Sequence, residues 1–417
     1  MGIVFPNEED QAEDRMLELR RLAETAGAEV AGEMIQHRTT PDKTFFIGKG
    51  KAEEVSLEAT RQAATLLIMD SDLSPAQARN LEQATGLRVV ERSQLIMDIF
   101  ASGARTLQAR KQVELAQMQY SLPRLKRLWS HLSRIRSGIG MRGPGETQLE
   151  VDRRIVRRKI GELKRELKTF ETRKRLEIDS RKMFFKVCLV GYTNSGKSTA
   201  LNSLTDAGVE EADRLFSTLD TRTRKWKLEG SLRVLLSDTV GFIRNLPHHL
   251  VASFHATLEE AATADLLLHV VDASHRAALD HIEAVDQVLN DIGSQKIPRI
   301  MVFNKTDLID DFMETSLLLQ RYPKHVLTSM KKGKGLEDLA EAVSLHLLST
   351  YAEVEVDMHV SAGKLYAFLA SVGDIIMSRH QDDRQYTTAR IPPFELGRLK
   401  ELAYAQKAQL KIHPSDS

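Results

Sequence analysis

The spacing of apolar residues divides the chain into stretches that predict different secondary structure. Between residues 8 and 100, segments with apolar residues at helical spacing alternate with three short apolar runs of strand length, TFFIG, ATLLIMD and RVVER. The segment SPAQARNLEQATG begins with Ser-Pro and ends on glycine, as helices commonly do. This alternation predicts a small α/β domain over residues 1–104.

A pattern of long helices begins at about Leu107. Apolar residues recur at spacings of 3 and 4 from Leu115 to Leu132, and a second apolar stripe runs from Leu149 to Phe170. Each stripe needs a partner, and the glycine-rich SGIGMRGPG joins them, so the pattern predicts an antiparallel two-helix arm over residues 105–182. Pro123 lies inside the first stripe and should kink or split that helix. Glu146 and Thr147 fit the start of the second helix.

Strand and helix patterns alternate again after Met183 until about Leu348. This predicts a mostly parallel sheet flanked by helices over residues 183–350. Beyond Thr350 the order is strand, helix, strand pair, helix, which predicts a small α+β domain over residues 351–417.

The net charge of +1 conceals an uneven distribution. Residues 101–182 hold 22 Lys and Arg against 9 Asp and Glu, an excess of 13 positive charges, so the rest of the chain carries −12. A basic segment in an otherwise acidic protein is typical of an element that binds a polyanion. The alternative is a solvated charged helix face.

Composition limits the cellular compartments in which the protein is expected. The single cysteine, Cys188, cannot form an internal disulfide and lies in an apolar run, so we expect it to pack in a core. No run approaches the roughly 20 apolar residues that a membrane helix needs, and the first residues lack the charged-then-apolar order of a signal peptide. We expect a cytoplasmic protein without stable membrane insertion.

The strongest local motif is FKVCLVGYTNSGKST, in which an apolar strand leads into Gly-x-x-x-x-Gly-Lys-Ser and then a helix. The glycines let the backbone wrap around phosphates, and the amide groups and the helix N-terminus attract negative charge. Lys197 is placed to reach the outer phosphates, and Ser198 can bind Mg²⁺.

Three downstream motifs indicate a guanine nucleotide. RVLLSDTVG ends a buried strand with Asp238, suited to holding Mg²⁺ through water, and places the Gly241 N–H near the γ-phosphate. MVFNKTD supplies Asp307, whose carboxylate can accept two hydrogen bonds that guanine offers and adenine does not. HVLTSMKKGKG offers Ser329 and the Met330 backbone to the edge of the base.

Two features between these motifs concern hydrolysis. A threonine of RLFSTLDTRTR should close over Mg²⁺; we choose Thr218, with Thr221 and Thr223 as alternatives. Phe242 stands where many GTPases place a water-orienting glutamine, so we expect slow hydrolysis until a partner completes the site. Asn194 could help bind a monovalent cation such as K⁺, or only form a hydrogen bond within the loop.

These motifs give the candidate site. The candidate catalytic groups are Lys197, Thr218 and Gly241, and the candidate metal ligands are Ser198, Thr218 and Asp238. The candidate nucleotide-binding residues are Gly191, Tyr192, Thr193, Asn194, Ser195, Gly196, Lys197, Ser198, Thr199, Asp238, Thr239, Val240, Gly241, Asn304, Lys305, Asp307, Ser329 and Met330.

Together the stretches FFIGKGKAEE, GPGETQLEVDRR, GYTNSGKST, LFSTLDTRTR, DTVGFIRNLPHHL and NKTD closely resemble the HflX GTPases of the Obg-HflX group. The resemblance extends from about residue 15 to 345 and continues more loosely in the tail; TSM stands where a Ser-Ala pair is usual. It implies an α/β fold with a P-loop GTPase domain, preceded by the small α/β domain and the two-helix arm and followed by the α+β C-terminal domain.

The resemblance also implies GTP or GDP and Mg²⁺ as cofactors. It implies an enzyme that binds the large ribosomal subunit and ribosomal RNA, is a monomer off the ribosome, and splits stalled ribosomes under stress. A basic arm tipped by a glycine loop suits insertion into an RNA-lined cleft. The candidate RNA-binding residues are Arg136, Arg142, Arg153, Arg154, Arg157 and Arg158, with Lys159 beside them.

Some alternatives stay open at this point. FIGKGKAEE could form a second phosphate loop, although its spacing favours a turn or an RNA contact. The chain could instead be an RNA-binding assembly factor with nucleotide as a structural ligand, or a GTPase that partners a tRNA-modifying enzyme.

Overall fold

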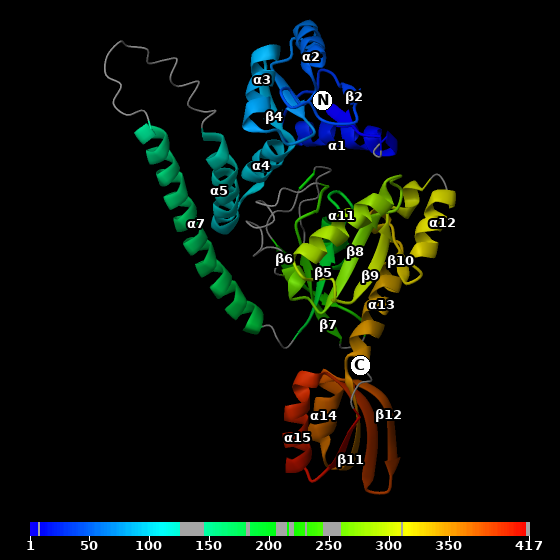
Figure 1. The fold of residues 1–417 in the computed structure, drawn as a ribbon. Helices are drawn as coiled ribbons and strands as arrows, with labels where there is room; N and C mark the ends of the chain where they lie inside the picture. The colour runs from blue at the N-terminus through cyan, green and yellow to red at the C-terminus, as the bar shows by residue number, and fades with distance from the viewer. Residues whose placement is uncertain are drawn as a thin grey trace.

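A computed structural model describes residues 1–6, 9–125, 146–180, 184–205, 215–216, 221–229, 232–244, 260–309 and 312–413 (Figure 1). The proposed domain limits at residues 104/105 and 350/351 fall between helices and strands, and the limit at 182/183 lies outside the described residues. Among the described residues, no helix combines the length and apolarity needed to cross a bilayer.

Short parallel strand pairs and helices make up the N-terminal part, as the alternating pattern predicts. The strand β1 pairs with β2, and β3 pairs with β4. Met1 bonds the backbone of Ile68 and Asp70, so β1 also adjoins β3. The elements are β1 (Gly2–Val4), η1 (Glu9–Gln11), α1 (Ala12–Thr25), β2 (Ile35–His37), α2 (Lys49–Arg61), β3 (Leu66–Met69), α3 (Pro75–Thr85) and β4 (Arg88–Glu91).

Local signals explain α3. Ser74 Oγ accepts from the Gln77 N–H at 3.2 Å, and Gln77 Oε1 accepts from the Ser74 N–H. The two bonds form a complete capping box. Gly86 ends the helix in the left-handed conformation.

The predicted strand TFFIG was wrong. Asp42 Oδ1 accepts the N–H groups of Thr44 and Phe45 at 2.8 and 2.7 Å, and Phe46 has a positive φ of 68°, so the segment folds into a turn. An aspartate that bonds the backbone two and three residues ahead stabilises a turn against an extended strand. Gly48 then precedes α2, so FIGKGKAEE is a turn followed by a helix.

The two-helix arm is confirmed over its described length. It consists of α5 (Leu107–Ser121), which follows α4 (Arg92–Gly103), and of the 35-residue α7 (Glu146–Ser180) (Figure 1). Leu115 packs against Leu163 and Leu167 in a buried cluster. Ion pairs join Lys111 to Glu166 at 2.6 Å and Glu114 to Lys159 at 3.3 Å, so residue numbers rise in one helix as they fall in the other, as in an antiparallel pair.

Pro123 ends α5, as expected. The helix stops at Ser121 and the chain continues as a short 3₁₀ turn, η2 (Leu122–Arg124), because proline cannot donate the next helical hydrogen bond. The glycine-rich loop, with Arg136 and Arg142, lies outside the described residues.

A six-stranded sheet forms the central part, in the order β10-β9-β8-β5-β7-β6. All neighbours are parallel except β6, which runs antiparallel to β7 at one edge. The elements are β5 (Phe185–Val190), α8 (Lys197–Leu204), β6 (Arg222–Lys227), β7 (Arg233–Asp238), β8 (Leu266–Asp272), α11 (Ala278–Asp291), β9 (Arg299–Asn304), η4 (Thr306–Leu308), α12 (Phe312–Arg321), β10 (His325–Leu327), η5 (Met330–Lys332) and α13 (Leu336–Ser349).

Each face of this sheet carries its own core. Leu189 and its neighbours pack against α8 and α13 on one face. On the other face Cys188 and Val190 belong to a cluster that includes α11 and also α1, α4 and α5. Cys188 is buried, as predicted. The N-terminal part and the arm base therefore share a core with the sheet.

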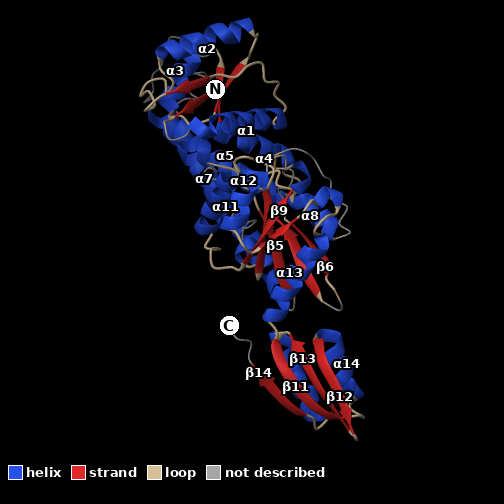
Figure 2. Cartoon of the chain, turned by 90° about the vertical axis from the view of Figure 1, so that its right-hand side faces the viewer, coloured by secondary structure: helices blue, strands red, loops and turns tan. Residues whose placement is uncertain are grey.

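The C-terminal residues form a separate four-stranded antiparallel sheet with two helices, at the far end from the N-terminal part (Figure 2). Its elements are β11 (Ala352–His359), α14 (Gly363–Val372), β12 (Asp374–Gln381), β13 (Arg384–Ile391), η6 (Pro393–Glu395), α15 (Leu396–Ala405) and β14 (Gln409–His413). The predicted elements are confirmed, and β14 adds one strand that the mixed polar pattern QLKIH did not indicate. The order is the split βαβ arrangement.

Candidate nucleotide-binding site

The Gly191–Ser198 loop joins β5 to α8 at the carboxyl end of the sheet. Here the strand order reverses direction, since β5 lies between β7 and β8, and open α/β sheets bind ligands at such a point. Gly196 has φ of 101°, and a Cβ there would lie 2.2 Å from Asn304 Nδ2. That amide donates to Ser195 O at 2.9 Å. The loop and the Asn-Lys-x-Asp segment are thus in direct contact.

Lys197 is buried beneath the loop. Its Nζ donates to Gly191 O at 3.0 Å and to Tyr192 O at 2.7 Å. Burial lowers the pKa of Lys197 to about 8, opposed by the charge of Asp238 and reinforced by Lys305. The ammonium group is therefore held by two carbonyl oxygens at the start of the loop.

Nucleotide affinity should fall as the pH rises through the pKa of Lys197. Polyphosphate favours the charged amine and raises its pKa on binding, so binding takes up a proton when the free amine is neutral. With a free pKa of about 8, linkage predicts that the Kd for GDP rises about fourfold between pH 7 and about 8.5. Titration of a fluorescent GDP analogue measures this, and a flat Kd over that range would contradict it.

Ser198 and Asp238 lie together at the start of α8 and the end of β7. Ser198 Oγ donates to Asp238 Oδ2 at 2.8 Å, and Asp238 is fully buried. A hydroxyl and a carboxylate are the oxygen donors that Mg²⁺ prefers beside phosphates. This donor set fits the magnesium site that the sequence predicts, and its occupation stays a prediction.

The segment after β7 packs on the loop. A Cβ on Gly241 would lie 2.8 Å from Thr193 Cα and 3.1 Å from Lys197 Nζ, so only glycine allows this approach. Phe242 bonds the loop through its backbone, accepting from Thr193 N at 2.7 Å and donating to Gly191 O at 3.1 Å. Its ring is buried in the core, so this position presents no polar side chain to a phosphate.

The base-recognition segments also meet. Asp307 Oδ1 accepts from Ser329 Oγ at 2.6 Å, and Oδ2 pairs with Lys332 at 3.1 Å. The Ser329 hydrogen bond, with Lys332, lowers the pKa of Asp307, so the carboxylate is ionised. Met330 N donates to Asn304 Oδ1 at 3.0 Å, so in this structure that N–H is engaged within the protein.

Lys305, between Asn304 and Asp307 in the sequence, is held by an ion pair with the neighbouring strand. Its Nζ pairs with Asp272 Oδ2 at 2.7 Å at the end of β8, and its φ of 62° is left-handed. The remaining candidates Thr199, Thr239 and Val240 lie on α8 and directly after β7, in the same region. Asn194 has φ of 59° at the loop tip, and its role toward a monovalent cation stays a prediction.

The structure describes two of the three candidate switch threonines, Thr221 and Thr223. Thr218 lies outside the described residues. Thr221 donates to Glu260 Oε1 at 3.0 Å, and Thr223 lies on β6, with its hydroxyl 2.9 Å from that of Ser237. Both alternatives therefore have protein partners, which leaves Thr218 as our proposal.

The candidate RNA-binding arginines are not part of this site. Arg153, Arg154, Arg157 and Arg158 lie on α7, a helix that stands apart from the loop (Figure 1). The latter three are exposed, and Arg153 is half-buried.

Sequence reasoning missed the contribution of α1. Glu18 Oε2 accepts from Tyr192 OH at 2.6 Å, and the same hydroxyl accepts from Arg244 N at 2.9 Å. The Tyr192 ring stacks on His281 with centroids 3.8 Å apart. Glu18 also pairs with Arg92, the first residue of α4. Glu18 and Tyr192 are 174 residues apart, so no local pattern could have revealed the contact.

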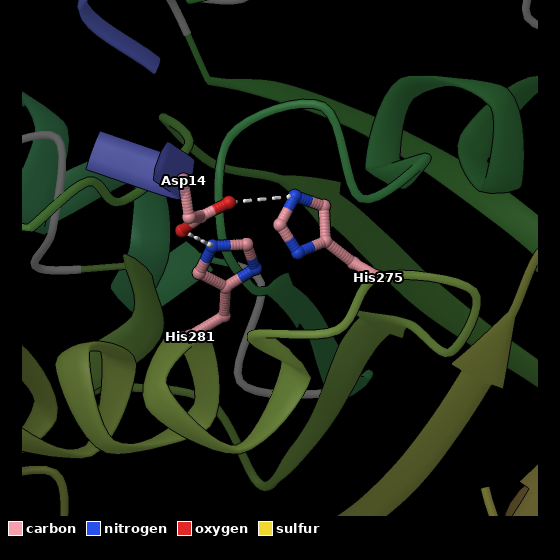
Figure 3. Close-up of side chains that lie close together, drawn as sticks. All are labelled: Asp14, His275 and His281. Carbon is pink, nitrogen blue, oxygen red and sulfur yellow. Dashed lines mark ion pairs between the residues drawn. The ribbon is translucent and has the colours of Figure 1, made fainter. Parts of the chain in front are cut away.

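Asp14, His275 and His281 form a second cluster beside Tyr192 (Figure 3). Their ligand atoms lie close enough for a metal ion, but two contacts argue against one. Arg244 Nη2 already pairs with Asp14 at 2.7 Å. His275 Nδ1 accepts from Ala277 N, so in the neutral ring the proton is on Nε2, which lies 3.2 Å from Asp14 Oδ1 and acts as a donor.

His281 is neutral in this cluster. Burial lowers its pKa, and together with the neighbouring His275, Arg244 and Lys305 it brings the pKa to about 2. The group is therefore a network of ion pairs and hydrogen bonds that holds α1 against the nucleotide loop and against the backbone that follows Gly241.

The fold and the site define a P-loop GTPase with a guanine-type base pocket. The chain is 43% identical over 366 residues to GTPase HflX of Caldanaerobacter subterraneus subsp. tengcongensis, covering 87% of this chain and 84% of the relative. It therefore belongs to the HflX family of GTPases. GTPase HflX of Escherichia coli K12 is 41% identical over 87% of this chain and 85% of its own length, and that of Magnetococcus marinus is 39% identical over 96% and 93%.

Family models match along the chain in the same order. A GTP-binding GTPase N-terminal model matches residues 13–101, a GTP-binding GTPase middle-region model matches 103–181, and a 50S ribosome-binding GTPase model matches 186–305. Among solved structures, a GTP-binding protein of Sulfolobus solfataricus in complex with GDP is 24% identical, covers 82% of this chain and 96% of its own, and has a TM-score of 0.42. A crystal structure of an SsGBP–GDP complex has a TM-score of 0.45, at 24% identity over 83% and 97%.

Proposed function

We propose that this GTPase binds the large ribosomal subunit through the α5/α7 arm and couples GTP binding and hydrolysis to ribosome splitting or anti-association under stress. The observation that carries the proposal is a row of exposed arginines, Arg154, Arg157 and Arg158, on the long helix α7 in the same chain as the nucleotide pocket. The 50S ribosome-binding description of the family model that matches residues 186–305 supports the choice of partner.

The pocket residues have distinct roles in this proposal. Lys197 and the amide groups of the loop bind the outer phosphates, and the Gly241 N–H contacts the γ-phosphate. Ser198, Asp238 and Thr218 would hold Mg²⁺, which neutralises charge on the phosphates when bound. The buried Phe242 ring leaves water orientation to another group, so the intrinsic rate is low until the large subunit contributes.

A continuous set of contacts leads from the loop to the base of the arm. Tyr192 binds Glu18, and Glu18 pairs with Arg92. The adjacent Glu91 accepts from Tyr120 OH, in the last turn of α5, at 2.7 Å and from Arg124 Nη2, in η2, at 2.7 Å. This continuity supports the proposal that GTP binding at the loop shifts the arm.

GTP turnover with and without purified large ribosomal subunits tests the function. We expect slow turnover alone and a marked rise in kcat with subunits. The rival function is an RNA-binding assembly factor in which nucleotide is a fixed ligand, and the buried Phe242 favours it. That rival predicts no stimulation and undiminished RNA binding in GDP.

Replacing the four arm arginines by glutamine should weaken binding to the large subunit and flatten its dependence on salt. Each phosphate contact contributes roughly 0.7–0.9 to the slope of log K against log salt, so loss of four contacts should lower the slope by up to about 3.6. The defect is therefore largest at low salt. Sedimentation over a salt series measures it, and nucleotide affinity should not change.

The matched control removes four positive charges from the nucleotide-binding part. Its residues are Arg276, Lys296, Arg321 and Lys324. An arm variant with the slope of the unmodified chain, or a control with the same loss, would argue against the arm as the binding element.

A further inference from the structure

The helix α1 turns one face toward the nucleotide loop. Asp14, Glu18 and Arg21 follow spacings of 4 and 3, which place them on one side of a helix. The first two are fixed by Arg244 and Tyr192, as described above. Arg21 comes next on that side, less than one turn beyond Glu18.

Arg21 and the loop tip share a narrow cavity. Its walls include Leu17 and Arg21 of α1, the loop tip Thr193 to Ser195, and Leu215. The volume is about 40 Å³, enough for a few waters and far too small for a nucleotide. The cavity is therefore the space between α1 and the loop tip, next to the outer phosphates that the loop would bind.

Arg21 is available to move into this space. Its side chain is exposed and forms no ion pair with any described residue, whereas the neighbouring Arg20 is paired with Glu33. The helix that carries it is held firmly, because Glu18 also binds Arg92 and Arg15 pairs with Asp70 at 2.9 Å. An exposed guanidinium without an ion-pair partner among the described residues can reach a phosphate from this fixed helix without first breaking an ion pair.

Hydrolysis requires positive charge beside the γ-phosphoryl group. Negative charge spreads over the γ-phosphoryl oxygens in the transition state, and many GTPases meet it with an arginine. Among the described pocket residues Lys305 is already paired with Asp272, and Phe242 presents no polar group. Lys197 is thus the main described cation at the loop.

We propose that Arg21 is a catalytic residue supplied in cis, whose guanidinium contacts the γ-phosphoryl oxygens during hydrolysis. Water attacks the γ-phosphorus, and the bond to the β,γ-bridging oxygen breaks with its electron pair leaving on GDP. The water proton ends on inorganic phosphate. Arg21 neutralises charge on the transferred group without forming a bond. The proposal rests on the nucleotide pocket proposed above.

The test compares Arg21→Ala and Arg21→Lys with the control Arg20→Ala in the full chain. Single-turnover hydrolysis of bound GTP should slow by about 10³- to 10⁵-fold in Arg21→Ala, somewhat less in Arg21→Lys, and remain within about twofold in Arg20→Ala. Affinity for a non-hydrolysable GTP analogue should not change in any variant.

A transition-state readout separates catalysis from structure. GDP with aluminium fluoride should form a stable complex with the unmodified chain and with Arg20→Ala, but not with Arg21→Ala. Unchanged or faster hydrolysis in Arg21→Ala, or equal losses in the Arg20 and Arg21 variants, would overturn the proposal. Large-subunit binding in the GTP analogue is read in parallel, so failure of the ribosomal function is distinguishable from failure of Arg21.

Discussion

Lys197→Ala will abolish tight binding of GTP and GDP. The buried ammonium is the cation that the loop encloses, and its removal also leaves Gly191 O and Tyr192 O without their donor. Removing one partner of a buried, hydrogen-bonded charge pair costs about 2–5 kcal/mol, which corresponds to a loss of affinity of roughly 30- to 4000-fold. Titration with a fluorescent GDP analogue gives the Kd directly.

Lys296→Ala is the control, because Lys296 is an exposed lysine outside the pocket. It should bind GDP like the unmodified chain. Thermal unfolding of both variants without nucleotide checks that the alanine at Lys197 has not disrupted the fold. If a folded Lys197→Ala variant bound GDP with unchanged affinity, the Gly191–Ser198 loop would not be the phosphate site.

Asp307→Asn will shift the base preference from guanine to xanthine. The ionised carboxylate accepts two hydrogen bonds from guanine, whereas an asparagine turns one acceptor into a donor that suits the second oxygen of xanthine. We expect GTP affinity to fall by about 10²- to 10³-fold and xanthosine triphosphate to become the better ligand. Competition between the two nucleotides measures the reversal.

Asp291→Asn provides the matched control at an exposed aspartate on α11. It should keep the preference for GTP. Retention of full GTP preference by Asp307→Asn would remove the assignment of NKTD as the base-recognition segment. The contact of Asp307 with Ser329 makes this outcome informative, because the hydroxyl can still bond the asparagine oxygen and hold the side chain in place.

Contiguous patterns predicted much of the fold. The phosphate-loop motif stands between β5 and α8 as expected, since strand, glycine loop and helix are specified within about fifteen residues. The two apolar stripes predicted the α5/α7 pair, because the spacing of Leu115 and Leu163 on their helices fixes which faces meet.

Errors arose where a local polar contact or a long-range partner decided the outcome. Asp42 turned TFFIG into a turn through two backbone hydrogen bonds that an apolar count ignores. The strand β14 forms because it pairs with β11, whose backbone hydrogen-bonding groups on that side need a partner.

The same limit applies to the site. Its motif residues meet as expected, and their roles as nucleotide ligands stay predictions. The contacts of α1 with Tyr192 and Arg244 come from folding two distant parts together. They could not be read from either segment alone.

The affinity for isolated large ribosomal subunits, measured in GDP and in a non-hydrolysable GTP analogue, tests most directly whether the nucleotide pocket controls the arm. We predict binding at least about tenfold tighter in the analogue, as a differential interaction of about 1.4 kcal/mol would give. The variant lacking the four arm arginines should lose most of that binding in both nucleotides. Equal affinities in the two nucleotides would contradict the link between pocket and arm.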